Sequence, residues 1–168
     1  HLNYKPIDTG RYLVCFTPEA FLDLIGSFSS MFNARAVLDG VSLSKPDTIG
    51  QQLAVPFFNL IDNGLHPAHV GAMPFDGEGT PTRTLRLIGD GRLESFLHSE
   101  ATARAFGVQP TGHAGLGAKV SVGPDWFEVH RSEGCTLPAD HLDHRTTSDP
   151  FVLIESLNAL HAGVKASQ

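Results

Sequence analysis

The sequence predicts an α+β domain that is β-rich, with a mostly antiparallel sheet, one long amphipathic helix and one short helix. Three observations support this prediction. Apolar residues recur at helical spacing from residue 18 to about residue 34. Short apolar and β-branched runs recur elsewhere, which is typical of strands. Asp90-Gly91 separates two such runs and is suited to a tight hairpin turn, which implies antiparallel pairing.

The long helix is predicted to begin after Thr17. This residue is a suitable N-cap, and Pro18 follows at the first helical position, where its missing N–H costs nothing. One stripe of apolar side chains then runs along the segment; its members are Phe21, Leu24, Ile25, Phe28, Met31 and Phe32. A Met and aromatic stripe of this kind predicts a core-facing helix rather than a cofactor site.

The strands are predicted from their residue types. The segments are 11–16, 53–61, 82–88, 92–98, 125–131 and 151–157, of which the first and last are predicted to be buried. Pro56 interrupts the second of them and makes it an edge strand or an irregular segment. The short helix, 100–106, follows a good N-cap at Ser99 and stops at Gly107.

Composition excludes some classes of function. The chain has 168 residues, enough for one domain with a core or for part of a larger domain, and a formal net charge of −6. Its Lys and Arg residues are scattered, which argues against a nucleic-acid partner. No apolar run approaches the ~20 residues that cross a bilayer, so no membrane partner is expected.

The two cysteines, Cys15 and Cys135, lie far apart in sequence. A secreted domain stabilised by disulfides usually contains more of them. Two buried or partly buried thiols in a reducing compartment are therefore the favoured interpretation, ahead of a structural bridge and of a reactive thiol.

The acidic residues of the stretch FDGEGTPT raise the question of chemistry. In an extended segment Asp76 and Glu78 would point to the same side and could bind a metal ion or share a proton. Alternatively, Gly77 and Gly79 set a turn in which the two acids accept hydrogen bonds from nearby amides. The absence of a His or a third carboxylate at metal-binding spacing favours the structural interpretation.

Several histidines are possible ligands. The segment 139–145 contains Asp140, His141, Asp143 and His144, but its surroundings predict a loop rather than a rigid zinc site. His66 and His69 are also predicted to lie in a surface loop, and His113 lies in a Gly-rich segment that could approach a ligand or another backbone closely. The sequence has no HExxH, GxSxG, CxxC or phosphate-loop motif, so the residues alone reach no catalytic mechanism.

Three segments, in this order, resemble the C-terminal half of the TldD/PmbA family, in which PmbA is also called TldE. They are VCFTPEAFLDLIGSF at 14–28, MPFDGEGTPTRTLRLIGDGRLESFLHSEATARAFG at 73–107 and TGHAG at 111–115. The resemblance covers roughly residues 10 to 165. It is strong over 73–115 and weak over 124–150.

The resemblance implies a cytoplasmic protease that degrades unfolded peptides and matures ribosomally made antibiotic peptides; the older family name is modulator of DNA gyrase. A TldD-like subunit carries zinc on a His-Glu-x-x-x-His helix, and the TldE-type subunit lacks it. This chain has no such helix, so it is interpreted as a TldE-type piece without catalytic or metal residues. Zinc is expected in a TldD-like partner, or the chain pairs with a second copy of itself.

In this interpretation the candidate residues Asp76, Glu78, Thr82 and His113 form a structural loop and a wall of a peptide-binding cleft. Family members are longer, so the chain is expected to be an incomplete C-terminal domain that needs the remainder of its polypeptide for stability. Two alternatives remain: part of an autonomous TldD-like metalloprotease, or a regulatory protein that acts on gyrase without proteolysis. A metal helix upstream would favour the first alternative, and failure to cleave any peptide would favour the second.

Overall fold

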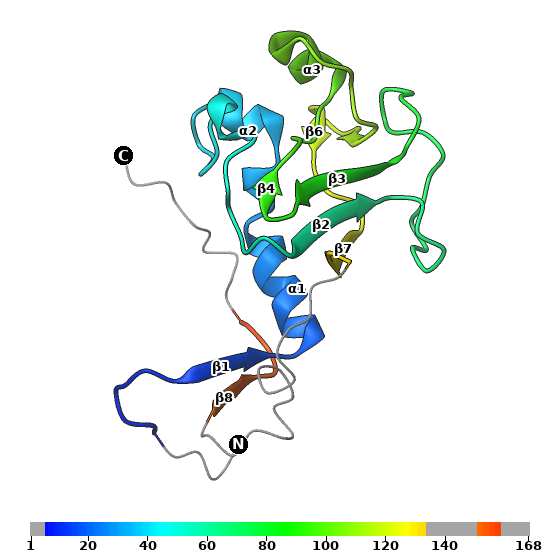
Figure 1. Ribbon diagram of the computed structural model, residues 1–168. Coiled ribbons are helices and arrows are strands. Elements are labelled where there is room, and N and C mark those ends of the chain that lie inside the picture. Colours follow the sequence, from blue (N-terminus) through cyan, green and yellow to red (C-terminus); the bar gives the residue numbers. More distant parts are fainter. Residues whose placement is uncertain (1–5, 134–150, 159–168) are drawn as a thin grey trace.

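The computed structural model describes residues 6–133 and 151–158 and has an α+β fold (Figure 1). Its central sheet has the strand order β4-β3-β2-β7, formed by β2 (Phe58–Asn63), β3 (Thr84–Gly89), β4 (Arg92–Leu93) and β7 (Phe127–Arg131). All three pairings in this sheet are antiparallel. The predicted fold class is therefore confirmed.

The predicted hairpin joins β3 to β4. Ile88 pairs with Leu93, and the turn residues Asp90 and Gly91 have φ of 47° and 77°. Positive φ at both central positions is the geometry that Asp-Gly turns favour in two-residue hairpins. β4 is much shorter than the predicted strand 92–98, because Leu97 leaves the sheet and its backbone pairs with Phe32 and Ala34 instead.

The predicted long helix, 18 to about 34, is divided into two pieces, and a third begins where the prediction ended. α1 spans Pro18–Ser27, a 3₁₀ turn (η1) spans Ser29–Met31, and α2 spans Ala34–Leu38. The break follows from the small polar residues around Phe28, since the Ser27 hydroxyl donates to the carbonyl of Leu24 at 2.6 Å and competes with the helical pattern. The predicted cap is confirmed: the Thr17 side chain accepts from the N–H of Ala20.

A new helix begins at Asn33 for a local reason. Its side-chain oxygen accepts from the N–H groups of Arg35 and Ala36, so it caps α2. α3 (Glu100–Phe106) is the short helix that the sequence predicted, with Ser99 as its N-cap and Gly107 at its end. Another 3₁₀ turn (η2) spans Pro46–Thr48, and a small hairpin joins β5 (Ala114–Gly115) to β6 (Ser121–Val122).

The hydrophobic core lies between the helical segment and one face of the central sheet. Its buried members are Phe32, Ala34, Val37, Leu60, Leu87, Ile88, Leu93, Phe96 and Leu97. Phe32 also meets Phe127 edge to face, with ring centroids 6.0 Å apart, which joins the helical layer to β7. The stripe predicted on the helix is therefore core in part: Ile25 and Phe32 pack in it, whereas α2 contributes residues beyond the stripe.

β1 (Leu13–Phe16) and β8 (Phe151–Ile154) form a separate parallel pair below the sheet, at the end of α1 (Figure 1). The prediction of a buried first strand is wrong, since Leu13 and Val14 are 48% and 46% exposed. β8 is half-buried rather than buried. Apolar residue type in a short run cannot distinguish a covered strand from an uncovered one.

Candidate functional site

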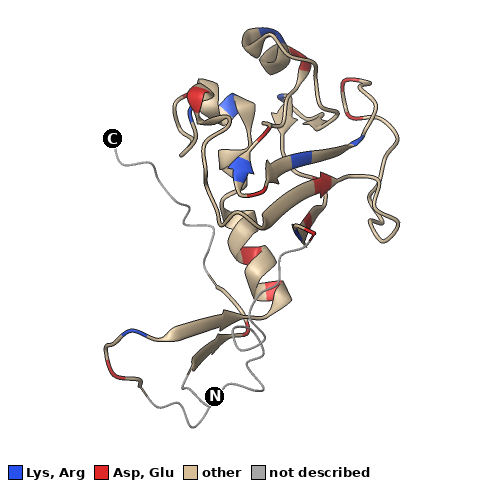
Figure 2. Cartoon of the chain, viewed as in Figure 1, with Lys and Arg blue, Asp and Glu red and all other residues tan. Residues whose placement is uncertain are grey.

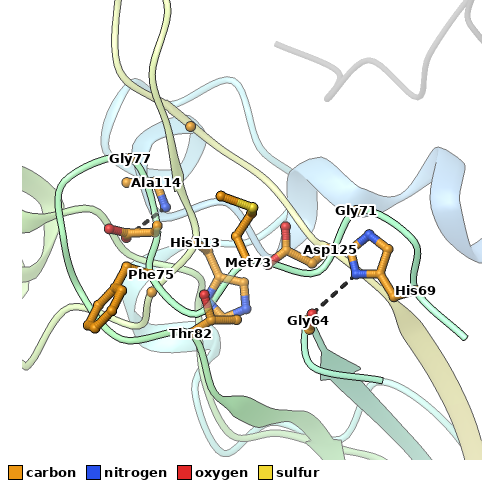
Figure 3. Close-up of a pocket in the computed structure, with 13 residues that line it drawn as sticks. Gly64, His69, Gly71, Met73, Phe75, Gly77, Thr82, His113, Ala114 and Asp125 are labelled. Atoms are coloured by element: carbon orange, nitrogen blue, oxygen red, sulfur yellow. Dashed lines mark hydrogen bonds between the residues drawn. The ribbon is translucent and has the colours of Figure 1, made fainter. Parts of the chain in front are cut away.

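A pocket lies at one end of the central sheet, where β2 ends and where β3 and β7 begin (Figure 3). It has a volume of about 190 Å³. Its walls come from the loops 64–82 and 112–125 and include Gly64, His69, Gly71, Met73, Phe75, Asp76, Gly77, Thr82, Gly112, His113, Ala114, Gly115 and Asp125. Three of the four residues singled out in the sequence therefore meet in one place.

Asp76 organises its own loop. Its Oδ1 accepts hydrogen bonds from the N–H groups of Glu78 and Thr80, both at 2.9 Å, and its Oδ2 accepts from the N–H of Ala114 at 3.0 Å. The carboxylate thus closes a turn and ties that turn to β5. These are the contacts of a turn-forming Asp, which hydrogen-bonds amides a few residues ahead.

Glu78 has a different environment from Asp76. Its Oε2 accepts from the N–H of Glu100 at 2.7 Å, at the exposed amino end of α3. It lines a second hollow together with Arg83, outside the main pocket. The carboxylate pair that an extended segment would have formed is therefore absent, because the loop turns between the two residues and directs their side chains to different partners.

Thr82 and His113 both line the pocket, and their loops meet at Gly112, where a Cβ would lie 3.1 Å from Cα of Thr82 (Figure 3). The His113 side chain is fully buried, and its Nδ1 lies 2.9 Å from the hydroxyl of Thr111. Its Nε2 lies 3.1 Å from Oδ2 of Asp62, but the direction of this contact is not that of a hydrogen bond, so Nε2 has only an electrostatic partner.

Asp62 is a central residue of the site that sequence reasoning missed. It is fully buried at the end of β2. Its Oδ1 accepts from the N–H of Trp126 at 2.6 Å, and its Oδ2 accepts from the N–H of Asp125 at 2.9 Å. The carboxylate therefore fixes the start of β7 to β2. An acid directly after the apolar run 53–61 was the available signal.

Asp125 was also missed, and His69 was predicted only as part of a surface loop. In Figure 3 both side chains reach the pocket, and Asp125 lies close enough to His113 to interact with it electrostatically. Burial, followed by the charge of Asp62, raises the pKa of Asp125 above its ordinary value. A raised carboxyl pKa in a cleft is typical of functional sites, although structural clusters show it as well.

The paired histidines lie in a surface loop, as predicted, but their rings are half-buried. The ring of His66 stacks on Trp126 with centroids 4.9 Å apart and planes 6° apart, and His69 lies 5.5 Å from the same indole. His69 also contacts the carbonyl of Gly64 through Nδ1, at 3.2 Å (Figure 3). Trp126 thus holds this loop against β7, and His69 is positioned as a wall of the pocket.

The described residues form no metal-binding cluster. Within residues 6–133 and 151–158, no three His, Cys, Asp or Glu side chains are grouped so as to hold a metal ion. The segment 139–145 and Cys135 lie outside the described residues, while Cys15 is a free, half-buried thiol.

Across the described helices, none is long and apolar enough to cross a membrane. Figure 2 shows Lys and Arg spread singly over several elements.

Replacing Asp76 with alanine is expected to lower the free energy of unfolding by about 2 kcal/mol, because three backbone N–H groups lose their acceptor. Chemical denaturation of the whole protein measures this change. Asp47→Ala is the matched control, since the Asp47 side chain takes part in no hydrogen bond in the described structure. Loss of bound metal from an otherwise equally stable Asp76→Ala protein would contradict the structural role.

His98 predicts a pH dependence of stability. Its ring is buried between Phe96 and Phe106, its Nδ1 has no hydrogen-bond partner, and burial lowers its pKa below the ordinary value of 6.5. The unfolded chain therefore binds a proton at His98 where the folded chain does not. The free energy of unfolding is expected to fall as the pH drops below about 6.5, and a His98→Leu variant should show a shallower fall. Parallel stability curves for the two proteins between pH 7 and pH 5 would rule out this contribution.

The fold and the pocket define an α+β domain with a small polar pocket at one end of an antiparallel sheet. The family model of the PmbA/TldA metallopeptidase C-terminal domain matches residues 9–166. The chain therefore belongs to the PmbA/TldD metallopeptidase family, as the sequence resemblance indicated.

Individual relatives agree with this assignment. The metalloprotease PmbA of Escherichia coli O157:H7 is 32% identical over 114 residues, which are 68% of this chain and 25% of that protein. A metalloprotease of Synechocystis is 33% identical over 88 residues, which are 52% of this chain and 19% of the relative. The chain thus spans a quarter or less of the length of these relatives.

Solved structures share the fold. A crystal structure described as a modulator of a DNA gyrase, from Thermotoga maritima, superposes with a TM-score of 0.80 at 32% identity, over 95% of this chain and 35% of the other. TldE from Thermococcus kodakarensis gives a TM-score of 0.62 at 22% identity, over 71% of this chain and 28% of the other, and shows the fold alone.

Proposed function

We propose that this domain forms one wall of the peptide-binding cleft of a TldD/TldE-type metallopeptidase. The observation that carries the proposal is the position of the pocket at the open end of a sheet whose described edge strand, β7, begins two residues after the lining residue Asp125. Because only Trp126 separates Asp125 from the start of β7, a chain that runs along this strand reaches the pocket.

An extended peptide suits this edge. Among the described residues, β7 pairs only with β2. A groove of about 500 Å³ runs beside β7 and is largely apolar, lined by Pro18, Phe21, Leu22, His66, Phe127, Glu128, Val129 and His130. A peptide added to a strand edge is held by its main chain while side chains enter neighbouring hollows. Binding of this kind tolerates many sequences, as the degradation of unfolded peptides and the maturation of modified peptides require.

The described residues do not fit a zinc site. The oxygens of Asp62 and Asp76 already accept backbone N–H groups, and no set of three ligating side chains is grouped in residues 6–133 and 151–158. We therefore assign no metal-dependent step to these residues. In the proposal this chain is a piece of a TldE/PmbA-type subunit, and the zinc belongs to a TldD-like partner in the cytoplasm.

Cleavage of an unstructured peptide tests the proposal. The whole protein is assayed alone and mixed with its TldD-like partner, with and without a zinc chelator. Activity only in the mixture, abolished by the chelator, is the expected result. Activity of the protein alone would assign this domain to an autonomous TldD-like enzyme. The absence of cleavage in every mixture would favour a regulatory role, as the gyrase-modulator description of the Thermotoga structure suggests.

A further inference from the structure

Asp125 is the one acidic residue lining the main pocket whose carboxylate has no hydrogen bond or ion pair in the described structure. Asp76, the other acid in the lining, accepts three backbone N–H groups. Asp62, just behind the pocket, fixes the backbone of Asp125 and Trp126. The Asp125 carboxylate therefore has no structural role in the described residues that would explain its position at the pocket.

The charge around Asp125 is uncompensated. The residues that line the pocket include neither Lys nor Arg. Arg83 follows the lining residue Thr82 in sequence, but it does not line the pocket. Its guanidinium donates to the backbone carbonyls of Pro110 and Thr111. The charges of His113 and His69 lower the pKa of Asp125, but by less than burial and the charge of Asp62 raise it. Asp125 is exposed to solvent at the pocket, and a cationic partner there would supply the opposite charge that the lining lacks.

The buried ring of His113 also lines the pocket, and its Nε2 forms no hydrogen bond but lies 3.1 Å from Oδ2 of Asp62, behind the pocket. Its two ring nitrogens therefore face Thr111 and Asp62, and Asp125 remains the charged group at the pocket without such a partner.

The shape of the pocket limits the size of that occupant. Its volume of about 190 Å³ corresponds to roughly six water molecules, and ligand pockets for whole small molecules are larger. Gly64 keeps the space beside Asp125 open, because a Cβ at this position would lie 2.7 Å from Oδ2 of Asp125. One side chain or one chain terminus is the appropriate size.

The rim of the pocket is apolar. Met73 and Phe75 line it and remain 66% and 55% exposed. Lys and Arg side chains characteristically lay their aliphatic stems along apolar surface while the charged end reaches a polar partner. A cation close to the face of Phe75 would gain a further cation–π attraction.

We propose that this pocket receives a cationic group of the bound peptide, with Asp125 as its counter-ion and Met73 and Phe75 as the apolar rim. The group is an ammonium or guanidinium, supplied either by a Lys or Arg side chain or by the amino terminus of the peptide. This inference rests on the proposed function, since it assumes that the domain binds peptides. It adds a preference for positive charge to a cleft that otherwise binds the peptide through its main chain.

Binding of labelled peptides to the whole protein tests the inference. Three peptides of the same length and core sequence are compared by fluorescence anisotropy: one acetylated and neutral, one acetylated with a single Lys, and one neutral in its side chains with a free amino terminus. We expect at least one cationic peptide to bind about tenfold more tightly than the neutral peptide. The peptide that does so identifies the source of the cation.

The Asp125→Asn variant supplies the decisive comparison. Asn has almost the same shape, so the variant should fold, and it should bind the neutral peptide as the wild type does while losing the tenfold preference. Asp23→Asn, an exposed acid on α1, is the matched control and should keep the preference. A preference that survives in Asp125→Asn overturns the inference. Equal binding of all three peptides to the wild type overturns it while leaving the proposed peptide cleft intact, and binding of none overturns both.

Discussion

Replacing Asp62 with alanine is expected to lower the free energy of unfolding by about 3 to 5 kcal/mol, which is a large fraction of the stability of an ordinary domain. Asp62 is fully buried, and its carboxylate accepts from the N–H groups of Asp125 and Trp126. Without it, these two groups lose their acceptor and His113 loses its 3.1 Å electrostatic partner. Removing one member of a buried charged network costs more than the network itself contributes, because the remaining groups stay desolvated.

Urea denaturation of the whole protein measures this loss, and two further variants locate its cause. In Asp62→Asn the amide oxygen can still accept, but its NH₂ group would face either an N–H donor or His113, so an intermediate loss is expected. Asp23→Ala removes an exposed carboxylate and should change stability by no more than about 0.5 kcal/mol. A loss of less than 1 kcal/mol in Asp62→Ala would show that the start of β7 is held by other contacts.

The elements that sequence predicted well are those fixed by local chemistry. Asp90-Gly91 sets its own turn, and Ser99 caps α3 by accepting from the N–H of Thr102. The long helix was predicted less well, because its apolar stripe continues across a break. The stripe reports which side of the segment is buried, whereas Ser27 and Asn33 decide where the backbone leaves and re-enters the helical conformation.

The site was harder to predict because it depends on long-range contacts. Asp76 was interpreted from its neighbouring glycines, and its contacts within the loop are indeed local. Asp62 and Asp125 are 63 positions apart in the chain, however, and their contact exists only because β2 and β7 are neighbours in the sheet. Without that strand order, Asp125 is one surface acid among many, and sequence periodicity gives no reason to select it.

Replacing Gly112 with alanine is expected to lower the free energy of unfolding by about 2 to 5 kcal/mol and to displace His113 from the pocket. Gly112 has a φ of 80°, which costs an L-residue about 1 to 2 kcal/mol. A Cβ at this position would also lie 2.4 Å from the carbonyl oxygen of Pro81 and 3.1 Å from Cα of Thr82. Because these atoms belong to the backbone, the two loops that form the pocket would have to separate.

Gly40→Ala separates the two causes. Gly40 has a φ of 70°, and nothing lies within 4 Å of the position of its Cβ, so this variant carries the backbone cost without the steric one. Gly112→Ala should therefore be clearly less stable than Gly40→Ala in the same denaturant series. Equal losses would mean that the loops carrying Pro81 and His113 move apart at little cost. In that case the close approach of the two loops would not be what positions Thr82 and His113 in the pocket.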